Sequence, residues 1–195
     1  MKTNHTLVLA AVLTLTALPA IAADTPAARI AQCIECHGEN GVATSSGYPN
    51  LGGQHQDYLL KQLRDFRAGR RRSPFMDIVA AKLDEAEVEN VAAYFARQNV
   101  VSDSVAANDA TGRRLFLEGD AKRGLTACAS CHGADARGAA LVPALRGQQM
   151  YYLREQLLNW RAGQRSNSPG RVMNQASDAL SDADIDALAR YLSQL

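Results

Sequence analysis

A cysteine motif that occurs twice constrains the fold of this chain more than any other feature of its sequence. Both copies read Cys-x-x-Cys-His, at residues 33–37 and 128–132, and together they contain all four cysteines. Four cysteines in an exported protein would first suggest disulfides, which could pair in three ways. The repeated spacing, with a histidine directly after the second cysteine each time, argues against that interpretation.

The motif is typical of covalent haem attachment. Two thiols can each bond a haem vinyl group, while the adjacent histidine turns its imidazole toward the iron. A zinc site and a redox dithiol are the alternatives, but neither needs a histidine at that position in both copies. The sequence therefore predicts two covalently bound haem c groups. The predicted tethers and proximal iron ligands are Cys33, Cys36, Cys128 and Cys131, with His37 and His132.

The duplication extends far beyond the cysteine motifs. The segment PNLGGQ at residues 49–54 is echoed by PALRGQ at residues 143–148, and matching Tyr-Leu and Gln-Leu pairs follow both. We therefore predict two copies of one module, at residues 23–97 and 110–195. Residues 98–109 between them are small and polar, as in a linker.

The periodicity of apolar residues within each module is helical. Over residues 58–66 they recur on one face of a helix, and the second copy repeats the pattern. Asp84 and Ser181 precede acid-rich segments, as helix starts do, and Gly69 and Gly163 mark the ends of the middle helices. No convincing alternating strand pattern is visible, so the predicted class is all-α.

Residues 1–22 have the pattern of a secretory signal peptide. Lys2 precedes an apolar run at residues 7–18, and small residues at 20–22 form a cleavage site. A membrane anchor is the alternative, but spanning takes about 20 apolar residues, and this run is shorter and ends at Pro19. We therefore expect a cleaved leader and a mature protein outside the cytoplasm.

The sixth iron ligand decides what a haem can do. Met76 and Met173 lie at matching places between a Ser-Pro dipeptide and the last helix of their module, although the second loop is two residues longer. A loop there can fold over the far haem face, so these methionines are the predicted distal ligands. Met150 has no counterpart and is expected to pack near the second helix of its module. His55 is expected at a helix start on the surface, and it leaves a haem site with two histidine ligands possible only in the first module.

These elements, in this order and twice, resemble the dihaem cytochromes c4, which consist of two class I cytochrome c domains. The resemblance covers essentially the whole mature chain. It implies that the carbonyls of Pro49 and Pro143 accept hydrogen bonds from the proximal imidazoles. It also implies a pseudo-twofold axis between the domains, with the haem propionates facing each other. The shared motifs are Cys-x-x-Cys-His-Gly, Pro-x-Leu-x-Gly-Gln, Tyr-Leu-x-x-Gln-Leu, Arg-x-Gly-x-Arg, the Met, and a closing helix with its Tyr.

The resemblance implies one-electron transfer in the periplasm of a bacterium. The implied donor is a quinol-oxidising cytochrome bc complex or another protein, and the implied acceptor is a haem-copper terminal oxidase. Such a carrier is not an enzyme, and it meets its redox partners through small, transient surfaces. We expect a monomer, and loose attachment to the membrane is compatible with the sequence.

Two other functional classes stay open. One is a dedicated cytochrome subunit of a periplasmic dehydrogenase, which would have the same haem sites and a stable partner. The other is a dihaem peroxidase, which needs one haem face that can open, and two matched methionines argue against it. Composition excludes further classes: 21 Lys and Arg against 20 Asp and Glu create no field suited to nucleic acid, and 47% hydrophobic residues are too many for a disordered chain.

Overall fold

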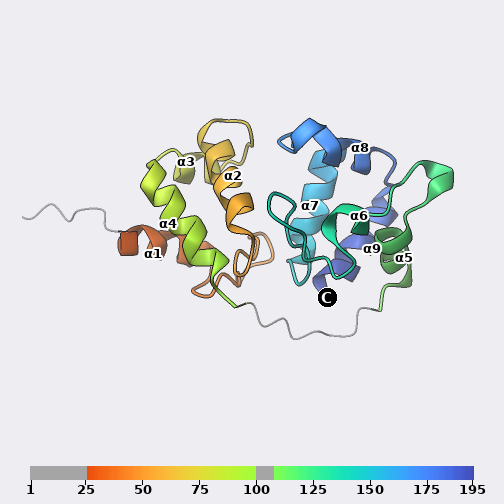
Figure 1. Cartoon of the computed structure of the whole chain (residues 1–195), viewed down its shortest axis with the longest axis horizontal. Coiled ribbons are helices and arrows are strands. Elements are labelled where there is room, and N and C mark those ends of the chain that lie inside the picture. The colour runs from red at the N-terminus through yellow and green to blue at the C-terminus, as the bar shows by residue number, and fades with distance from the viewer. Residues whose placement is uncertain (1–25, 100–107) are drawn as a thin grey trace, which may run out of the picture.

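The computed structural model describes residues 26–99 and 108–195, which form helices joined by loops (Figure 1). In these segments the only β contacts are two isolated bridges, so the predicted all-α class is confirmed. No helix in them is long and apolar enough to cross a membrane. The predicted signal peptide and most of the predicted linker lie outside the described residues.

The N-terminal module has a small helical core. The cysteine motif ends the first helix, and the second and fourth helices pack against each other over an apolar cluster that includes Leu59, Val91 and Phe95. The helices are α1 (Pro26–His37), α2 (Gln56–Arg67), α3 (Met76–Ala80) and α4 (Glu85–Ala96).

The C-terminal module repeats this plan with a longer entry. The cysteine motif has its own short helix here, and the preceding helix packs on the closing helix over a larger buried cluster around Phe116, Ile185 and Leu188. The elements are α5 (Ala110–Glu118), the 3-10 turn η1 (Ala121–Arg123), α6 (Ala129–His132), α7 (Met150–Arg161), the 3-10 turn η2 (Pro169–Arg171), α8 (Val172–Asp178) and α9 (Asp182–Ser193).

The predicted helix boundaries follow from local chemistry. Asp84 and Ser181 cap α4 and α9, and in both helices the acidic third residue completes a capping box. Gly69 and Gly163 follow the ends of α2 and α7 with φ angles of 68° and 72°, a left-handed conformation that favours glycine. Met150, however, begins α7 with 48% of its surface exposed, so its predicted packing role is wrong. In the first turn of α7 the Met150 side chain points to solvent and not toward the core.

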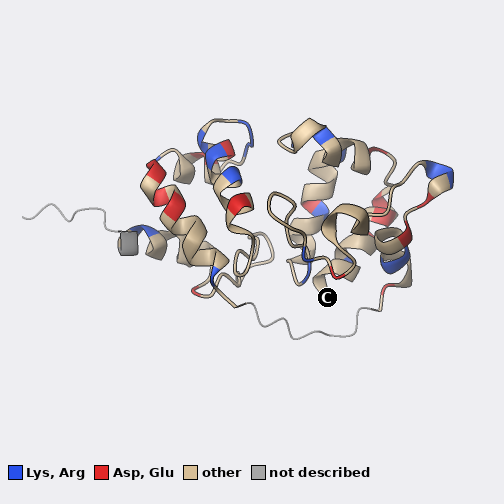
Figure 2. Ribbon diagram, in the orientation of Figure 1, with Lys and Arg blue, Asp and Glu red and all other residues tan. Residues whose placement is uncertain are grey.

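The middle and closing helices of the two modules are joined in the same way. Arg67 donates to the carbonyl oxygen of Leu83 (3.2 Å) and pairs with Glu85 at the start of α4. Arg161 donates to the carbonyl oxygen of Leu180 (2.7 Å) and pairs with the acidic residue that begins α9. Figure 2 shows basic residues near the end of α2 and acidic residues near the start of α4, where these ion pairs form.

The two modules exchange matching hydrogen bonds, as a pseudo-twofold arrangement requires. Gln54 donates to the carbonyl oxygen of Ala144 (3.0 Å) and accepts from its N–H (2.9 Å). Gln148 donates to the carbonyl oxygen of Asn50 (2.9 Å) and accepts from its N–H (2.7 Å). Each repeated glutamine thus forms hydrogen bonds with the backbone of the other module. The paired domains implied by the resemblance are confirmed (Figure 1).

One glycine sets how closely α5 approaches α9. A Cβ atom at Gly112 would lie 2.1 Å from the carbonyl oxygen of Ala187 and 2.7 Å from the Cβ of Tyr191. Backbone atoms cannot rotate away as a flexible side chain can. Any larger residue must therefore push the two helices apart.

Gly112→Ala is expected to destabilise the C-terminal module by about 1–3 kcal/mol, the usual cost of overpacking. In an unobstructed helix the same change would stabilise by up to about 1 kcal/mol, so the sign of the effect tests the contact. Chemical denaturation followed by circular dichroism measures it. Gly47→Ala is the control, because a Cβ there meets nothing closer than 4.0 Å, and its effect should stay within about 0.5 kcal/mol. A neutral or stabilising Gly112→Ala would contradict the prediction.

A second constraint ties the inserted turn to the closing helix. Arg123 in η1 donates to both carboxylate oxygens of Asp184 (2.7 and 3.3 Å). These hydrogen bonds outweigh the opposing effect of burial and lower the pKa of Asp184 to about 2. Because the folded pKa lies below that of the unfolded chain, this carboxylate stabilises the fold above about pH 4, and the contribution is lost as the pH falls toward 2.

Asp184→Asn should therefore lower the stability of the C-terminal module at pH 7, and the difference from wild type should shrink between about pH 4 and pH 2. Denaturant titrations at several pH values test this. Asp186→Asn is the matched control, since Asp186 pairs with Arg154 on the surface of the same helix and both side chains are 39% exposed. A stability difference that stays constant down to pH 2 would contradict the prediction, because it would show that Arg123 does not lower the pKa of Asp184 in the folded protein.

Candidate haem sites

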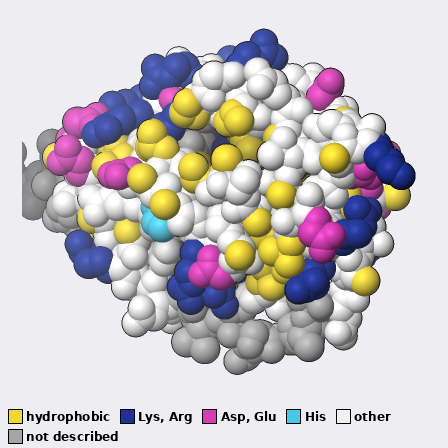
Figure 3. Space-filling model, turned by 45° about the vertical axis from the view of Figure 1, so that its right-hand side comes forward, with side chains coloured by type: hydrophobic (Ala, Val, Ile, Leu, Met, Phe, Trp, Pro, Cys, Tyr) yellow, Lys and Arg dark blue, Asp and Glu magenta, His cyan; other side chains and the backbone are white. Residues whose placement is uncertain are grey.

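Both cysteine motifs open onto one large cavity of about 1380 Å³. This exceeds the roughly 300–1,000 Å³ of an ordinary small-molecule pocket, and its walls come from both modules. Figure 3 shows hydrophobic side chains around a hollow on one face, with Lys and Arg side chains near its margin. All the predicted site residues line this cavity, namely Cys33, Cys36, His37, Met76, Cys128, Cys131, His132 and Met173.

The two predicted proximal histidines are buried and oriented alike. Nδ1 of His37 donates to the carbonyl oxygen of Pro49 (2.9 Å), and Nδ1 of His132 donates to that of Pro143 (3.0 Å). Burial lowers the pKa of both imidazoles, and the hydrogen bonds to the proline carbonyls oppose this only in part. Each ring is therefore neutral with its proton on Nδ1, which leaves the Nε2 lone pair for a metal ion.

The four cysteines are free thiols, so the disulfide interpretation is excluded for this structure. Burial raises the pKa of the Cys33 thiol to about 11 and also raises that of Cys128. A redox dithiol needs an accessible thiolate, and burial disfavours the thiolate at the first cysteine of each motif. The described residues also contain no group of three or more His, Cys, Asp or Glu placed to hold a metal ion, so the zinc alternative has no site.

The distal loops hold their methionines by the same contact in spite of unequal length. The N–H of Met76 donates to Oγ of Ser73 (3.3 Å), and the N–H of Met173 donates to Oγ of Ser168 (3.1 Å). The two extra residues of the second loop lie in η2, where consecutive positions 170 and 171 have φ angles of 59° and 56°. This left-handed pair absorbs the additional length. Both methionines are half-buried.

His55 stands at the N-cap of α2, as expected, but it is not simply a surface residue. Its Nε2 donates to the carbonyl oxygen of Arg137 in the other module (2.8 Å). The matching residue, Gln149, donates to the carbonyl oxygen of Ala43 (3.0 Å). His55 therefore belongs to the reciprocal contacts between modules, and it does not line the cavity.

Two buried arginines between the modules are not among the predicted site residues. Arg71 donates to Gln62 (2.9 Å) in its own module and to Tyr152 (2.9 Å) and Gln156 (3.0 Å) in the other. Arg165 makes the mirror set of contacts and lies 4.3 Å above the Trp160 ring, as Arg71 lies 4.6 Å above Phe66. The repeated Arg-x-Gly-x-Arg motif is the sequence signal that could have singled them out.

The cavity fits the predicted cofactor. In the described part of the chain both guanidinium groups donate to amide and phenol oxygens and pair with no carboxylate, although both residues line the cavity and are buried. Buried cations are stable only when paired with anions. Haem supplies two propionate carboxylates on an apolar plate, which matches an apolar cavity with Arg71 and Arg165 in its wall. Each of two haem groups would be tethered by two of the four thiols, and each imidazole would bind one iron.

Fold and site together define a dihaem c-type cytochrome. The chain belongs to the cytochrome c family, whose model matches residues 26–98 and 110–195, and it is a dihaem electron carrier similar to the cytochromes c4. Two covalently bound haem c groups follow from the two domains and their four cysteines.

The individual similarities extend over nearly the whole chain. Cytochrome c4 of Pseudomonas aeruginosa is 35% identical over 190 residues, 93% of each protein. A thiosulfate dehydrogenase electron acceptor of Stutzerimonas stutzeri is 36% identical over 170 residues, 84% of this chain and 78% of that protein. The crystal structure of reduced cytochrome c4 from Pseudomonas stutzeri superposes with a TM-score of 0.81 and 33% identity, covering 87% of this chain and 96% of that one. The family resemblance noted from sequence is confirmed.

Replacing Cys33 and Cys36 by Ala should leave the N-terminal module without attached haem while the C-terminal module keeps its own. Because the cofactor completes a small core, that module should become largely unfolded and sensitive to protease. Far-ultraviolet circular dichroism, limited proteolysis and the haem content of the fragments measure this. The matching Cys128→Ala, Cys131→Ala variant should give the opposite pattern. Native helicity and protease resistance in the first variant would contradict the prediction.

Proposed function

We propose that the protein is a periplasmic carrier of single electrons whose two haem groups have histidine and methionine as axial ligands. The repetition of one arrangement around the cavity carries this proposal: a buried imidazole fixed by a proline carbonyl, and a methionine loop fixed by a serine. The proposed iron ligands are His37 with Met76 and His132 with Met173, and the proposed tethers are Cys33, Cys36, Cys128 and Cys131.

The proposed domain organisation follows the predicted boundaries. A signal peptide occupies residues 1–22, the N-terminal domain residues 23–97, the linker residues 98–109 and the C-terminal domain residues 110–195. The two segments matched by the family model support the domain limits. The leader-like pattern of the first residues supports export to the periplasm. There the protein would receive its covalent haem groups and act as a monomeric carrier.

When bound, haem supplies a metal that gains or loses one electron without a change of ligands. The work of the chain is therefore to hold ligands still. The Pro49 and Pro143 carbonyls fix the imidazole rings, and the Ser73 and Ser168 hydroxyls fix the loops that carry the methionines. An iron bound by both a histidine and a methionine would have no free ligand position for a substrate. This supports an electron carrier over a peroxidase.

The proposed partners are a quinol-oxidising cytochrome bc complex, or another donor, and a haem-copper terminal oxidase. A specific observation favours a second candidate. The relatives include thiosulfate dehydrogenase electron acceptors at 36% and 37% identity, similar to the values for cytochromes c4. A dedicated role beside a periplasmic dehydrogenase is therefore the alternative proposal.

Electron delivery to the purified oxidised holoprotein separates these proposals. It is mixed either with a cytochrome bc complex and quinol or with thiosulfate dehydrogenase and thiosulfate, and haem reduction is followed by absorbance. Fast reduction by the bc complex, followed by reoxidation by the oxidase, supports the respiratory carrier. Fast reduction only by the dehydrogenase, with stable co-purification, supports the alternative. Turnover of hydrogen peroxide would contradict both.

Met76→His and Met173→His should each lower the potential of one haem and leave the other nearly unchanged. Thioether ligation raises the potential relative to a nitrogen donor, and exchanging axial ligands changes it on the order of 100 mV. Potentiometry of the holoprotein measures both values. Met150→His is the matched control, because this exposed residue lies outside the cavity wall and should alter neither potential. A ligand assignment is wrong if its variant leaves both potentials in place.

A further inference from the structure

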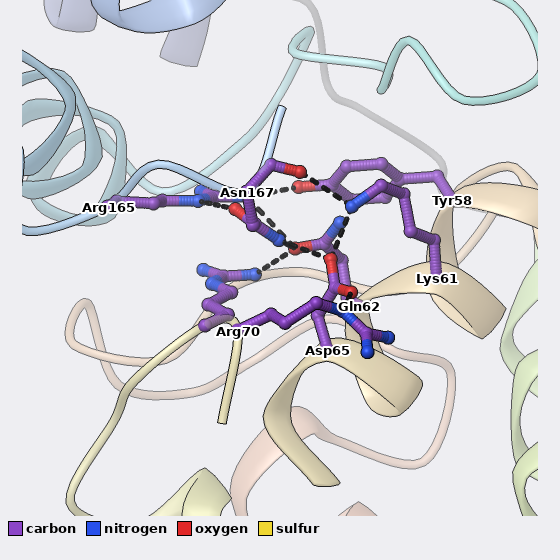
Figure 4. A network of polar contacts seen from close by, with 8 residues as sticks. Tyr58, Lys61, Gln62, Asp65, Arg70, Arg165 and Asn167 are labelled. Carbon is purple, nitrogen blue, oxygen red and sulfur yellow. Dashed lines mark hydrogen bonds and ion pairs between the residues drawn. The ribbon is translucent and has the colours of Figure 1, made fainter. Parts of the chain in front are cut away.

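One contact between the modules has no mirror image. Asn167, which directly precedes Ser168 in the second distal loop, is held by three residues of α2 in the other module (Figure 4). The side-chain amide nitrogen of Asn167 donates to Asp65 (2.7 Å) and to Gln62 (3.0 Å). Its backbone carbonyl oxygen accepts from Lys61 (2.6 Å). Hydrogen bonds from the N-terminal module thus hold the start of the methionine loop of the C-terminal module.

Asp65 is the centre of this cluster. Its side chain is only 4% exposed and also accepts hydrogen bonds from Lys61 and from Nε of Arg70 (2.7 Å). Burial alone would raise the pKa of Asp65, but the hydrogen bonds from Lys61, Asn167 and Arg70 hold it below its usual value. The carboxylate is therefore ionised, and its bond to Asn167 is a charge-assisted one.

Asn167 is connected to the predicted iron ligand Met173 through its neighbour in the loop. Asn167 is joined by one peptide bond to Ser168, whose Oγ accepts the hydrogen bond from the N–H of Met173 (3.1 Å). On its other side, Oδ1 of Asn167 accepts from Nε of Arg165 (3.1 Å). The residue at the base of the loop is thus fixed from both modules.

The first distal loop is held from within its own module instead. Arg72, which directly precedes Ser73, pairs with Asp77 (2.8 Å), and Asp77 also accepts from the N–H of Ser73 (3.0 Å). The C-terminal module carries Asn174 at the place of Asp77, and Asn159 at the place of Asp65. Each methionine loop is therefore anchored by a carboxylate of the N-terminal module.

We propose that Asp65, acting through Asn167, is a positioning residue for the distal methionine of the other module, so that the N-terminal module sets how firmly Met173 is held, without the reverse. This inference rests on the proposed ligation of iron by Met173. It makes two haem sites with identical ligands unequal in how easily their methionines detach.

The test is the rate at which imidazole displaces each methionine from the oxidised holoprotein. Nuclear magnetic resonance follows the ligand-methionine methyl signal of each haem separately. Asp65→Asn and Asn167→Ala should each accelerate displacement at the C-terminal haem about tenfold, as expected for loss of a hydrogen bond to a charged group, and leave the N-terminal rate unchanged. Asn167→Ala lies on a loop and supplies the test if Asp65→Asn fails to fold.

Three further variants separate positioning from a general weakening of the interface. Asp77→Asn is the mirror test and should accelerate only the N-terminal haem. His55→Ala breaks an inter-module contact away from the cavity and should change neither rate. Combining Asp65→Asn with Asn167→Asp exchanges amide and carboxylate, so it should restore most of the wild-type rate at the C-terminal haem.

Equal acceleration at both haems in Asp65→Asn, or the same acceleration in His55→Ala, would overturn the proposal. So would two ligated-methionine signals with unchanged kinetics in Asp65→Asn and Asn167→Ala, and this outcome would leave the ligand assignment intact. A wild-type spectrum without a signal from ligated Met173 would overturn the assignment itself, and the inference with it.

Discussion

The structure depends on a core that the polypeptide does not complete alone. The cavity of about 1380 Å³ lies between the apolar clusters of the two modules and takes its walls from both. A module of this size buries too little apolar surface to offset the entropy of ordering its chain. Covalent attachment at the cysteine motifs and packing of the helices are therefore parts of one folding process.

The shared cavity also explains why the modules are joined by polar contacts. Arg71 and Arg165 lie on aromatic rings and are tied by tyrosines and glutamines from both modules. Two buried cations beside each other would repel unless anions reach them, and the propionates of haem are the anions that this cavity is suited to receive. Filling the cavity and closing the interface thus reinforce each other.

Local features of the sequence predicted much of this arrangement. The capping residues Asp84 and Ser181 and the terminating Gly69 and Gly163 act through their immediate neighbours, so their roles can be read from the sequence. The cysteine motif likewise carries its chemistry within five residues. The exposure of Met150 could not be predicted, because the rotation of a helix about its axis is set by tertiary packing. The partners of Arg71 and Asp65 lie far away in the sequence, so the burial of these side chains could not be predicted from their neighbours, and only the repetition of the Arg-x-Gly-x-Arg motif marks Arg71.

The interface shows how two copies of a module can become unequal without separating. The repeated hydrogen bonds of Gln54 and Gln148 go to backbone atoms, which every residue supplies, so the side chains of the residues they contact are free to change. The contact of Asp65 with Asn167 needs particular side chains and occurs once. The symmetric contacts with the backbone therefore hold the two modules against each other. The side-chain contact of Asp65 with Asn167 gives the methionine loop of the C-terminal module an anchor in the other module, whereas the loop of the N-terminal module is held by Asp77 of its own module.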